Sequence, residues 1–274
     1  MHPNFKVHVH SNRPDQVLGW FLTHDCQISE VHVHNMKLQS DERNEKIEAQ
    51  LEAEHKPLGV VAVAPGSGTA KILESLGVDV VISGGQTMNP STADILAAVN
   101  KVNADSVVIL PNNKNIIMAA QACVEVSEKP CAVVATTSVP QAFSAMFGFD
   151  GEASLEENVE AMTEAFAEVK TGEVTHAIKD SKDAHGNPIK DGDVIGIADG
   201  SIEAVGSDVS DVVLALLETM EADDADTMTI LAGEDFSDED LEALVAHIEE
   251  AYEDLEIDPH RGEQALYPVV FSLE

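Results

Sequence analysis

The sequence predicts an α/β fold: a two-lobed domain with a parallel sheet covered by helices, preceded by a partial βαβ piece and a linker helix. Between residues 58 and 136, short segments that are apolar throughout alternate with longer amphipathic segments, the pattern of a parallel sheet buried on both faces. In the second half, Asp199-Gly200 separates two apolar segments and indicates a hairpin. Near the start, FKVHVH alternates with a period of two, as strands do.

The first 56 residues predict a small piece followed by a connector. Residues 5–10 and 28–35 read as two strands, and Pro14 suits the first turn of a helix between them. Residues 1–36 are too few to bury a core alone and resemble the end of a larger domain. Residues 37–56 contain neither glycine nor proline and are rich in Glu, Lys, Gln and Ala, so they predict a linker helix.

The remaining domain, residues 57–274, is expected to form lobes of about 57–170 and 171–274. Gly77 ends the first helix, and Ser91 caps the second. Strands are expected at 58–64, 78–83, 106–110, 132–136, 172–179, 194–198, 201–205, 228–231, and near Leu255 and Val269. Helices are expected at 67–76, 91–102, 114–126, 141–147, 155–169, 208–220 and 238–252, with a turn-rich loop at 182–193.

The charge balance excludes several classes of partner. The chain carries 50 acidic and 15 basic residues, a net charge of −35. Nucleic-acid backbones and anionic membranes would be repelled, and no apolar run predicts insertion into a membrane. The acid is concentrated at residues 152–168 and 218–254. A strongly hydrated surface is the ordinary interpretation, and a docking surface for a basic partner is the sharper one.

The cysteines indicate a reducing compartment. The three cysteines, Cys26, Cys123 and Cys131, are an odd number in a large chain and include no CxxC pair. This usage predicts a cytoplasmic protein without a disulfide framework or redox chemistry.

Four histidines suggest a metal site. His8 and His10 leave the same face of the first predicted strand, and His32 and His34 do the same on the second. Imidazole is a good ligand for zinc, which takes four donors in tetrahedral geometry. The alternative is that all four are surface histidines on amphipathic strands.

Two amide-rich loops predict a binding edge. The first offers Gly84, Gly85, Gln86, Thr87, Asn89 and Ser91; the second offers Asn112, Asn113 and Asn115. Both follow strands of the parallel sheet, so they should meet at the edge where open α/β sheets place their sites. Amides orient ligands but take no proton at neutral pH, and turn formation or helix capping explains part of the set equally well. No catalytic residue is predicted. A third loop, Ala64-Pro65-Gly66-Ser67-Gly68-Thr69, reads as a tight turn or as an anion site at a helix start.

Many linked blocks carry a family resemblance. They are FKVHVHSNRPDQVL, HNMKLQ, VVAVAPGSG, GGQTMNPSTADIL, ILPNNKNI, EASLEENVEAMTEA, VKTGEVTHAIKDS, KDGDVIGIADG and LYPVVFSLE. Together they resemble the catalytic, ATP-binding subunit of bacterial fatty acid kinase, a dihydroxyacetone-kinase-like family associated with DegV proteins. The match covers the end of the middle domain and the C-terminal domain.

The resemblance implies a role for each part. It implies a zinc site that includes His8 and His10, dimerisation through the middle domain, and a C-terminal domain that docks a fatty-acid-binding, DegV-like protein. ATP and magnesium would bind a helical N-terminal domain outside this chain, which would phosphorylate the acyl carboxylate. The present portion is therefore expected to be inactive alone. The chain departs from the family at Glu263 and Ala265, where a glycine and a proline are usual.

Two other functions stay open. The chain is alternatively a stand-alone α/β domain that binds a small molecule or phosphate through the amide loops, or a phosphatase-like hydrolase. A ligand pocket between the lobes would favour the first. The lack of an acid, base or nucleophile in the amide loops counts against the second.

Overall fold

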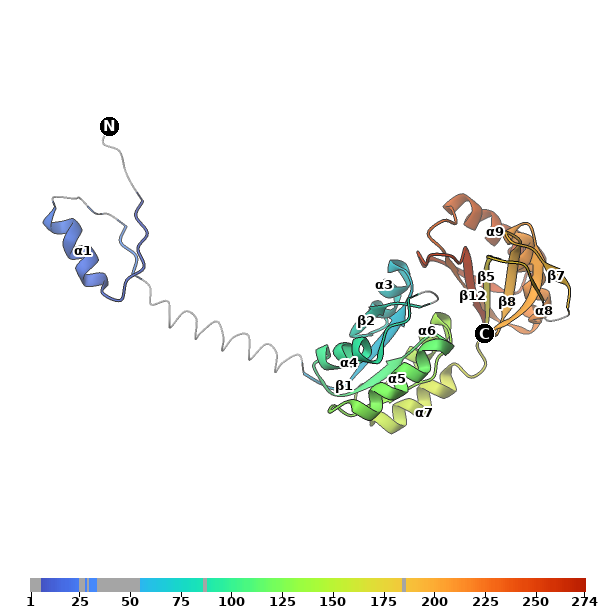
Figure 1. The fold of residues 1–274 in the computed structure, drawn as a ribbon, viewed down its shortest axis with the longest axis horizontal. Helices are drawn as coiled ribbons and strands as arrows, with labels where there is room; N and C mark the ends of the chain where they lie inside the picture. Colours follow the sequence, from blue (N-terminus) through green and yellow to red (C-terminus); the bar gives the residue numbers. More distant parts are fainter. Residues whose placement is uncertain (1–5, 25–27, 29, 34–54, 86–87, 184–185) are drawn as a thin grey trace, which may run out of the picture. The chain divides into compact units, whose positions relative to one another are not determined.

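A computed structural model describes residues 6–24, 28, 30–33, 55–85, 88–183 and 186–274 (Figure 1). The chain divides into two compact units, Met1–Glu54 and His55–Glu274. Among the described residues, no helix is both long and apolar enough to cross a bilayer.

The first unit contains the helix α1 (Pro14–Thr23), with proline in its first turn as expected. The predicted strands differ: residues 6–10 and 30–33 belong to no strand in the described part of this unit. A period-two pattern marks a face, but a strand also needs a partner to accept its hydrogen bonds. No residue of α1 is buried, so the described part of this unit has no core around its helix. The linker-helix prediction lies outside the described residues, except that Lys56 begins the first strand.

The first lobe of the second unit is built on a four-stranded parallel sheet in the order β2-β1-β3-β4. In register, Val61 of β1 lies opposite Val80 of β2 and Ile109 of β3. The predicted parallel sheet is thereby confirmed. Its strands are β1 (Lys56–Ala64), β2 (Val80–Ser83), β3 (Ala104–Leu110) and β4 (Cys131–Val133).

Helices cover both faces of this sheet, as the continuous apolar strands predicted (Figure 1). Val60 and Ala62 of β1 face one cluster of buried side chains, and Val61 and Val63 face another. The first cluster is covered by α3 (Ser67–Ser75), α6 (Val139–Phe147) and α7 (Leu155–Ala165), and the second by α4 (Thr92–Lys101) and α5 (Lys114–Val126).

The helix ends follow local sequence chemistry. The Ser91 hydroxyl accepts a hydrogen bond from the Asp94 amide, and the Asp94 carboxylate accepts one from the Ser91 amide, so a capping box begins α4. The Asn113 side chain caps α5 in a similar way, through the Asn115 amide. Gly77 follows α3 with φ +103°, a conformation that favours glycine.

The second lobe is a six-stranded sheet in the order β11-β10-β12-β5-β8-β9, with one parallel pair, β10 and β11. Asp199 and Gly200 both have positive φ, so the predicted hairpin between β8 and β9 is confirmed. The predicted loop at 182–193 contains part of a short separate hairpin of β6 (Ser181–Lys182) and β7 (Pro188–Ile189). The main strands are β5 (Lys170–His176), β8 (Val194–Ala198), β9 (Ser201–Gly206), β10 (Thr227–Ala232), β11 (Glu256–Arg261) and β12 (Val269–Leu273).

One face of this second sheet packs on α8 (Val209–Thr219) and α9 (Asp238–Ala251). Phe271 of β12 is fully buried in that layer. Its ring lies against Gly172 of β5 so closely that a Cβ there would overlap it. Leu231 and Val270, on the opposite face, pack against the first lobe, so the two lobes share one apolar layer.

Two buried thiols predict a pH-dependent stability. Cys123 of α5 and Cys131 of β4 are both buried, and burial together with Cys131 raises the pKa of Cys123 from 9.0 to about 11. The unfolded chain therefore loses this proton first as the pH rises, so the free energy of unfolding should fall between pH 9 and 11. The expected slope is about 1 kcal/mol per pH unit, because the two titrations overlap.

Urea unfolding at pH 8, 9 and 10 would measure this slope in the native chain and in Cys123→Ala. Between pH 9 and 10 the free energy of unfolding of Cys123→Ala should fall by about 1 kcal/mol less than that of the native chain, whatever the stability of the variant at pH 7. Equal slopes in the two proteins would contradict the assignment. Cys26 lies outside the described residues.

Candidate functional site

A cavity of about 170 Å³ lies between the two lobes, and is called the interlobe cavity below. The first lobe contributes residues just beyond the carboxyl ends of its strands, among them Pro65 after β1, Gly84 after β2 and Pro111 after β3. The second lobe contributes Glu173, Leu231, Val270 and the segment 264–267. The cavity therefore occupies the sheet edge at which the sequence predicted a binding site.

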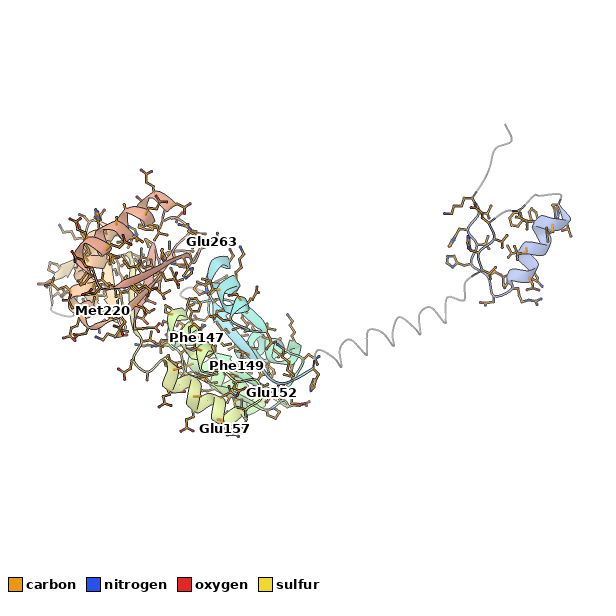
Figure 2. All side chains as sticks on the ribbon, turned by 180° about the vertical axis from the view of Figure 1, so that it is seen from behind. Phe147, Phe149, Glu152, Glu157, Met220 and Glu263 are labelled. Atoms are coloured by element: carbon orange, nitrogen blue, oxygen red, sulfur yellow. The ribbon has the colours of Figure 1, made fainter. Side chains whose placement is uncertain are left out.

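The lobes are joined beside this cavity by the start of α3. The backbone amides of Gly68 and Thr69 each donate to the Gly262 carbonyl at 3.1 Å. The Ser67 hydroxyl donates to the Glu263 carboxylate, which places a negative charge at the helix start (Figure 2). The sequence could not exclude that the amides at the start of this helix bind an external anion. In the structure the Gly68 and Thr69 amides donate to the Gly262 carbonyl instead, so the loop serves as a tight turn.

Glycine is required where the two backbones meet. A Cβ on Gly68 would overlap the carbonyl oxygen of Arg261, and one on Gly66 would overlap the backbone at Gly262 and Glu263. Glu263 itself has φ +55°, a conformation in which glycine costs least. The family resemblance implies a glycine at this position, and this backbone conformation suits one; here the Glu263 carboxylate gains the bond to Ser67 instead.

Asn112 ties three strand ends together. Its side-chain amide donates to the Val63 carbonyl at 2.8 Å, and its Oδ1 accepts from the Thr136 hydroxyl at 2.6 Å. Its φ of +56° is tolerated better by asparagine than by most residues. Asn112 is buried and lines the cavity, so its clearest role is to hold the shape of the site.

Asn113 lines the cavity next to it and is 9% exposed. Its Oδ1 accepts from the Asn115 amide at 2.9 Å, while its Nδ2 makes no hydrogen bond to the rest of the described chain. One amide proton pair is therefore free to meet a ligand. Lys114, the only cation of this loop, instead donates to the Asp199 carbonyl of the second lobe at 2.9 Å.

Some of the amide-loop residues predicted to form a binding edge line the cavity, and others do not. Gly84, Gly85, Asn112 and Asn113 line it. Asn89, Ser91 and Asn115 are exposed and lie outside the lining, and Ser91 and Asn115 serve the two helix caps. Gln86 and Thr87 lie outside the described residues.

Sequence reasoning missed the contribution of the second lobe. Glu173, Gln264 and Tyr267 line the cavity, and so does Ser138, whose hydroxyl shares a 2.9 Å hydrogen bond with the Thr171 hydroxyl across the lobes. Ser138 could have been found as the residue before a helix, where it caps α6. The other three sit at positions whose meaning depends on how the lobes pack.

The described lining of the cavity contains one carboxylate side chain, that of Glu173. Burial and the Glu173 carboxylate together raise the pKa of Tyr267 to about 12. No lysine, arginine or histidine is found in the described lining.

The first unit holds the predicted histidine pair. The Nε2 atoms of His8 and His10 are 3.1 Å apart on exposed side chains. Tetrahedral zinc with bonds of about 2.0–2.1 Å would hold two ligand nitrogens roughly 3.3 Å apart, so this pair fits two of four positions. Within the described residues no group of three candidate ligands is assembled. His32 is exposed and belongs to no such group, and His34 lies outside the described residues.

Comparison with solved structures defines the fold class. The chain resembles a DegV family protein from Corynebacterium glutamicum, with a TM-score of 0.57 and 15% identity over 80% of this chain and 96% of that one. A Thermotoga maritima protein whose structure revealed fatty acid binding gives 0.56 and 14%, over 80% and 99%. The fatty acid kinase B3 protein of Streptococcus pneumoniae, loaded with linoleic acid, gives 0.51 and 13%, over 79% and 99%. These likenesses show a DegV-like α/β fold.

Sequence comparison then gives the family. The C-terminal domain of FakA-like fatty acid kinase proteins matches residues 59–274, and the middle domain of the same proteins matches residues 1–43. The chain belongs to this FakA-like fatty acid kinase family, which confirms the resemblance in its sequence. Protein YloV of Bacillus subtilis is 39% identical over 98% of this chain, and an uncharacterised protein of Staphylococcus haemolyticus is 36% identical over 98%. The chain spans about half the length of these relatives, 49% and 50%.

Proposed function

We propose that this chain is the partner-docking and dimerisation portion of the catalytic subunit of a fatty acid kinase, and that it transfers no phosphate by itself. The match to the middle and C-terminal domains of that family carries the proposal. Its partner would be a DegV-like fatty-acid-binding protein. ATP and magnesium would act through a nucleotide-binding domain outside this chain, in a reducing cytoplasm. Hydrolysis of ATP by this chain alone would contradict the proposal.

We place the docking surface on the outer face of α7, in the lobe where exposed acidic residues occur together with an exposed aromatic ring. Glu156, Glu160 and Glu164 are exposed and spaced four residues apart, so they form one acidic stripe along the helix. Like charges at this spacing cost a helix a few tenths of a kcal/mol per pair. A basic surface on the partner would offset that cost. Phe147, at the end of α6 in the same lobe, is 80% exposed and offers an apolar anchor (Figure 2).

Calorimetry with the fatty-acid-binding protein of the same organism would test docking at low and high salt, roughly 50 mM and 300 mM. We expect binding at low salt and a loss of at least about tenfold at high salt, since exposed charge pairs are screened. Neutralising the stripe with Glu156→Gln, Glu160→Gln and Glu164→Gln should remove most of that salt dependence. No binding at either salt would contradict docking by this portion.

A matched control separates the stripe from net charge. Glu239→Gln, Glu242→Gln and Glu249→Gln remove the same number of exposed charges from α9, in the other lobe. If the stripe is the docking surface, this second triple variant should bind as the native chain does. Equal losses in both variants would assign the effect to overall charge.

We also propose that His8 and His10 hold zinc, with the remaining ligands outside the described residues. Bound zinc would crosslink the first unit, whose described part has no core around α1. Mass spectrometry under native conditions should detect zinc in the native chain and lose it in His8→Ala. A His247→Ala variant, which removes a histidine of α9, should keep the metal. Zinc retained by His8→Ala would contradict the assignment.

The interlobe cavity favours a second function, binding of a small molecule between the lobes. It is enclosed by residues of both lobes and includes four of the predicted amide-loop positions. No observation favours a hydrolase: the described lining offers the hydroxyls of Thr69, Ser83, Ser138 and Tyr267 but no histidine or lysine to activate them.

A further inference from the structure

The side chain of Asn113 has an unused hydrogen-bond donor at the wall of the interlobe cavity. Asn113 is 9% exposed, and its Oδ1 accepts from the Asn115 amide at 2.9 Å. This bond fixes which end of the side chain is the oxygen, because only an acceptor can meet an N–H. Nδ2 therefore lies on the other side, with two protons and no acceptor in the described chain.

A ligand can reach this donor. Two buried side-chain atoms in the described chain lack a hydrogen-bond partner, Gln264 Oε1 and Ser272 Oγ, and protein atoms enclose both. Gln264 Oε1 lies against the backbone of Gly262, where no ligand fits. Asn113 Nδ2 has no partner either, but it is not enclosed in this way. It is therefore the unused polar atom that a molecule in the cavity could meet.

The volume and the wall of the cavity limit the rest of the ligand. The volume is about 170 Å³, and a dry engineered cavity of about 150 Å³ accepts benzene, so a single ring or a chain of about six carbons would fill it. Val139, Leu231 and Val270 contribute to an apolar wall. Met88 and Leu266 also line the cavity and are 72% and 56% exposed, so they mark its mouth.

The donor and the apolar wall together favour a carbonyl group. A carbonyl oxygen accepts a hydrogen bond and brings no proton that would need an acceptor of its own, whereas a hydroxyl group does. An ionised carboxylate also accepts, but it loses far more hydration than a carbonyl when it enters apolar surroundings. An unused donor that leaves water is costly, and an acceptor on the ligand removes that cost.

We propose that the interlobe cavity binds a small, mainly apolar carbonyl compound, about the size of a six-membered ring, whose oxygen accepts a hydrogen bond from Asn113 Nδ2. The inference rests on the second candidate function and deepens it, because it names a class of ligand and the residue that recognises it. The two ends of one side chain then serve different purposes: Oδ1 caps α5, and Nδ2 holds the ligand.

Cyclohexanone and methylenecyclohexane test the inference, since they have nearly the same shape and only the first has an acceptor oxygen. Methyl NMR spectra of the whole chain would report binding through Val139, Leu231 and Val270, and we expect both compounds to shift these signals. Asn113→Asp keeps the oxygen that caps α5 and replaces the donor by a second oxygen. The ratio of the cyclohexanone affinity to the methylenecyclohexane affinity should fall at least about fivefold in this variant.

Two further variants isolate the donor from the charge. Asn115→Asp makes the same substitution on an exposed side chain of the same helix, outside the cavity lining, and should leave the ratio within about twofold of the native value. Asn113→Ser also caps a helix and adds no charge, but its side chain is too short to replace Nδ2, so the ratio should fall as in Asn113→Asp.

The possible failures are distinguishable. A native ratio in Asn113→Ser would overturn the recognition of a carbonyl by Asn113 and leave small-molecule binding standing. An equal fall in Asn115→Asp would overturn it as well, because charge alone would then explain the effect. If neither compound shifted the three sets of methyl signals, both the inference and the second candidate function would be overturned. Docking is measured separately, with the partner protein, and does not depend on this outcome.

Discussion

Replacing Gly68 by alanine is expected to lower the free energy of unfolding by about 3 kcal/mol. The new Cβ would overlap the Arg261 carbonyl oxygen, so the backbones of the two lobes would have to move apart. That movement would also break the bonds from the Gly68 and Thr69 amides to Gly262. In an isolated helix the same substitution stabilises by about 1 kcal/mol, so the sign itself tests the close approach.

Urea unfolding would measure the loss, and small-angle scattering would show whether the lobes separate before the chain unfolds. Gly151→Ala is the matched control, because the nearest atom to a Cβ there is 3.8 Å away and belongs to Phe149. It should change stability by less than about 0.5 kcal/mol. If Gly68→Ala were as stable as the control, the backbones at Gly68 and Arg261 could move apart at little cost in free energy, contrary to this prediction.

Truncating Phe271 to alanine is expected to cost about 3–5 kcal/mol. The ring is fully buried between the second sheet and its helices, and it also covers the bare face of Gly172. Glycine in a strand leaves a gap that a neighbouring aromatic ring can fill. Removing the ring therefore leaves a cavity beside Gly172, which has no side chain to fill it.

Phe147→Ala is the matched control, because it removes the same side chain at a position where the ring is 80% exposed. Its free energy of unfolding should stay within about 0.5 kcal/mol of the native value in the same denaturant series. If both substitutions cost the same, burial would not explain the loss at Phe271.

The first lobe could be predicted almost element by element. Segments such as residues 58–64 and 106–110 are apolar almost throughout and became buried strands, while Ser91 and Gly77 marked helix boundaries by chemistry that acts within a few residues. The Asp199-Gly200 turn was equally local. Each of these signals is complete within one segment of chain.

The candidate site could be predicted only in half. The amide loops follow parallel strands, so their shared edge was predictable, and Asn112 and Asn113 do line the cavity. Glu173, Gln264 and Tyr267 carry no local mark of a site, because they reach the cavity through the packing of a second sheet against the first. The predicted strands at residues 5–10 and 28–35 failed, in their described part, for a related reason: alternation describes a face but does not supply a pairing partner.

Local chemistry thus settled the α/β class, the parallel direction of the strands in the first sheet, the helix caps and the family. Packing between distant segments decided the rest. It decided between a tight turn and an anion site at the start of α3, where the chain's own Gly262 and Glu263 take the helix donors. It also directed Lys114 to the Asp199 carbonyl and brought Glu173 to the cavity. Hydrogen-bond partners and charged neighbours from distant segments are decided by tertiary packing, which the spacing of residues along the sequence does not specify.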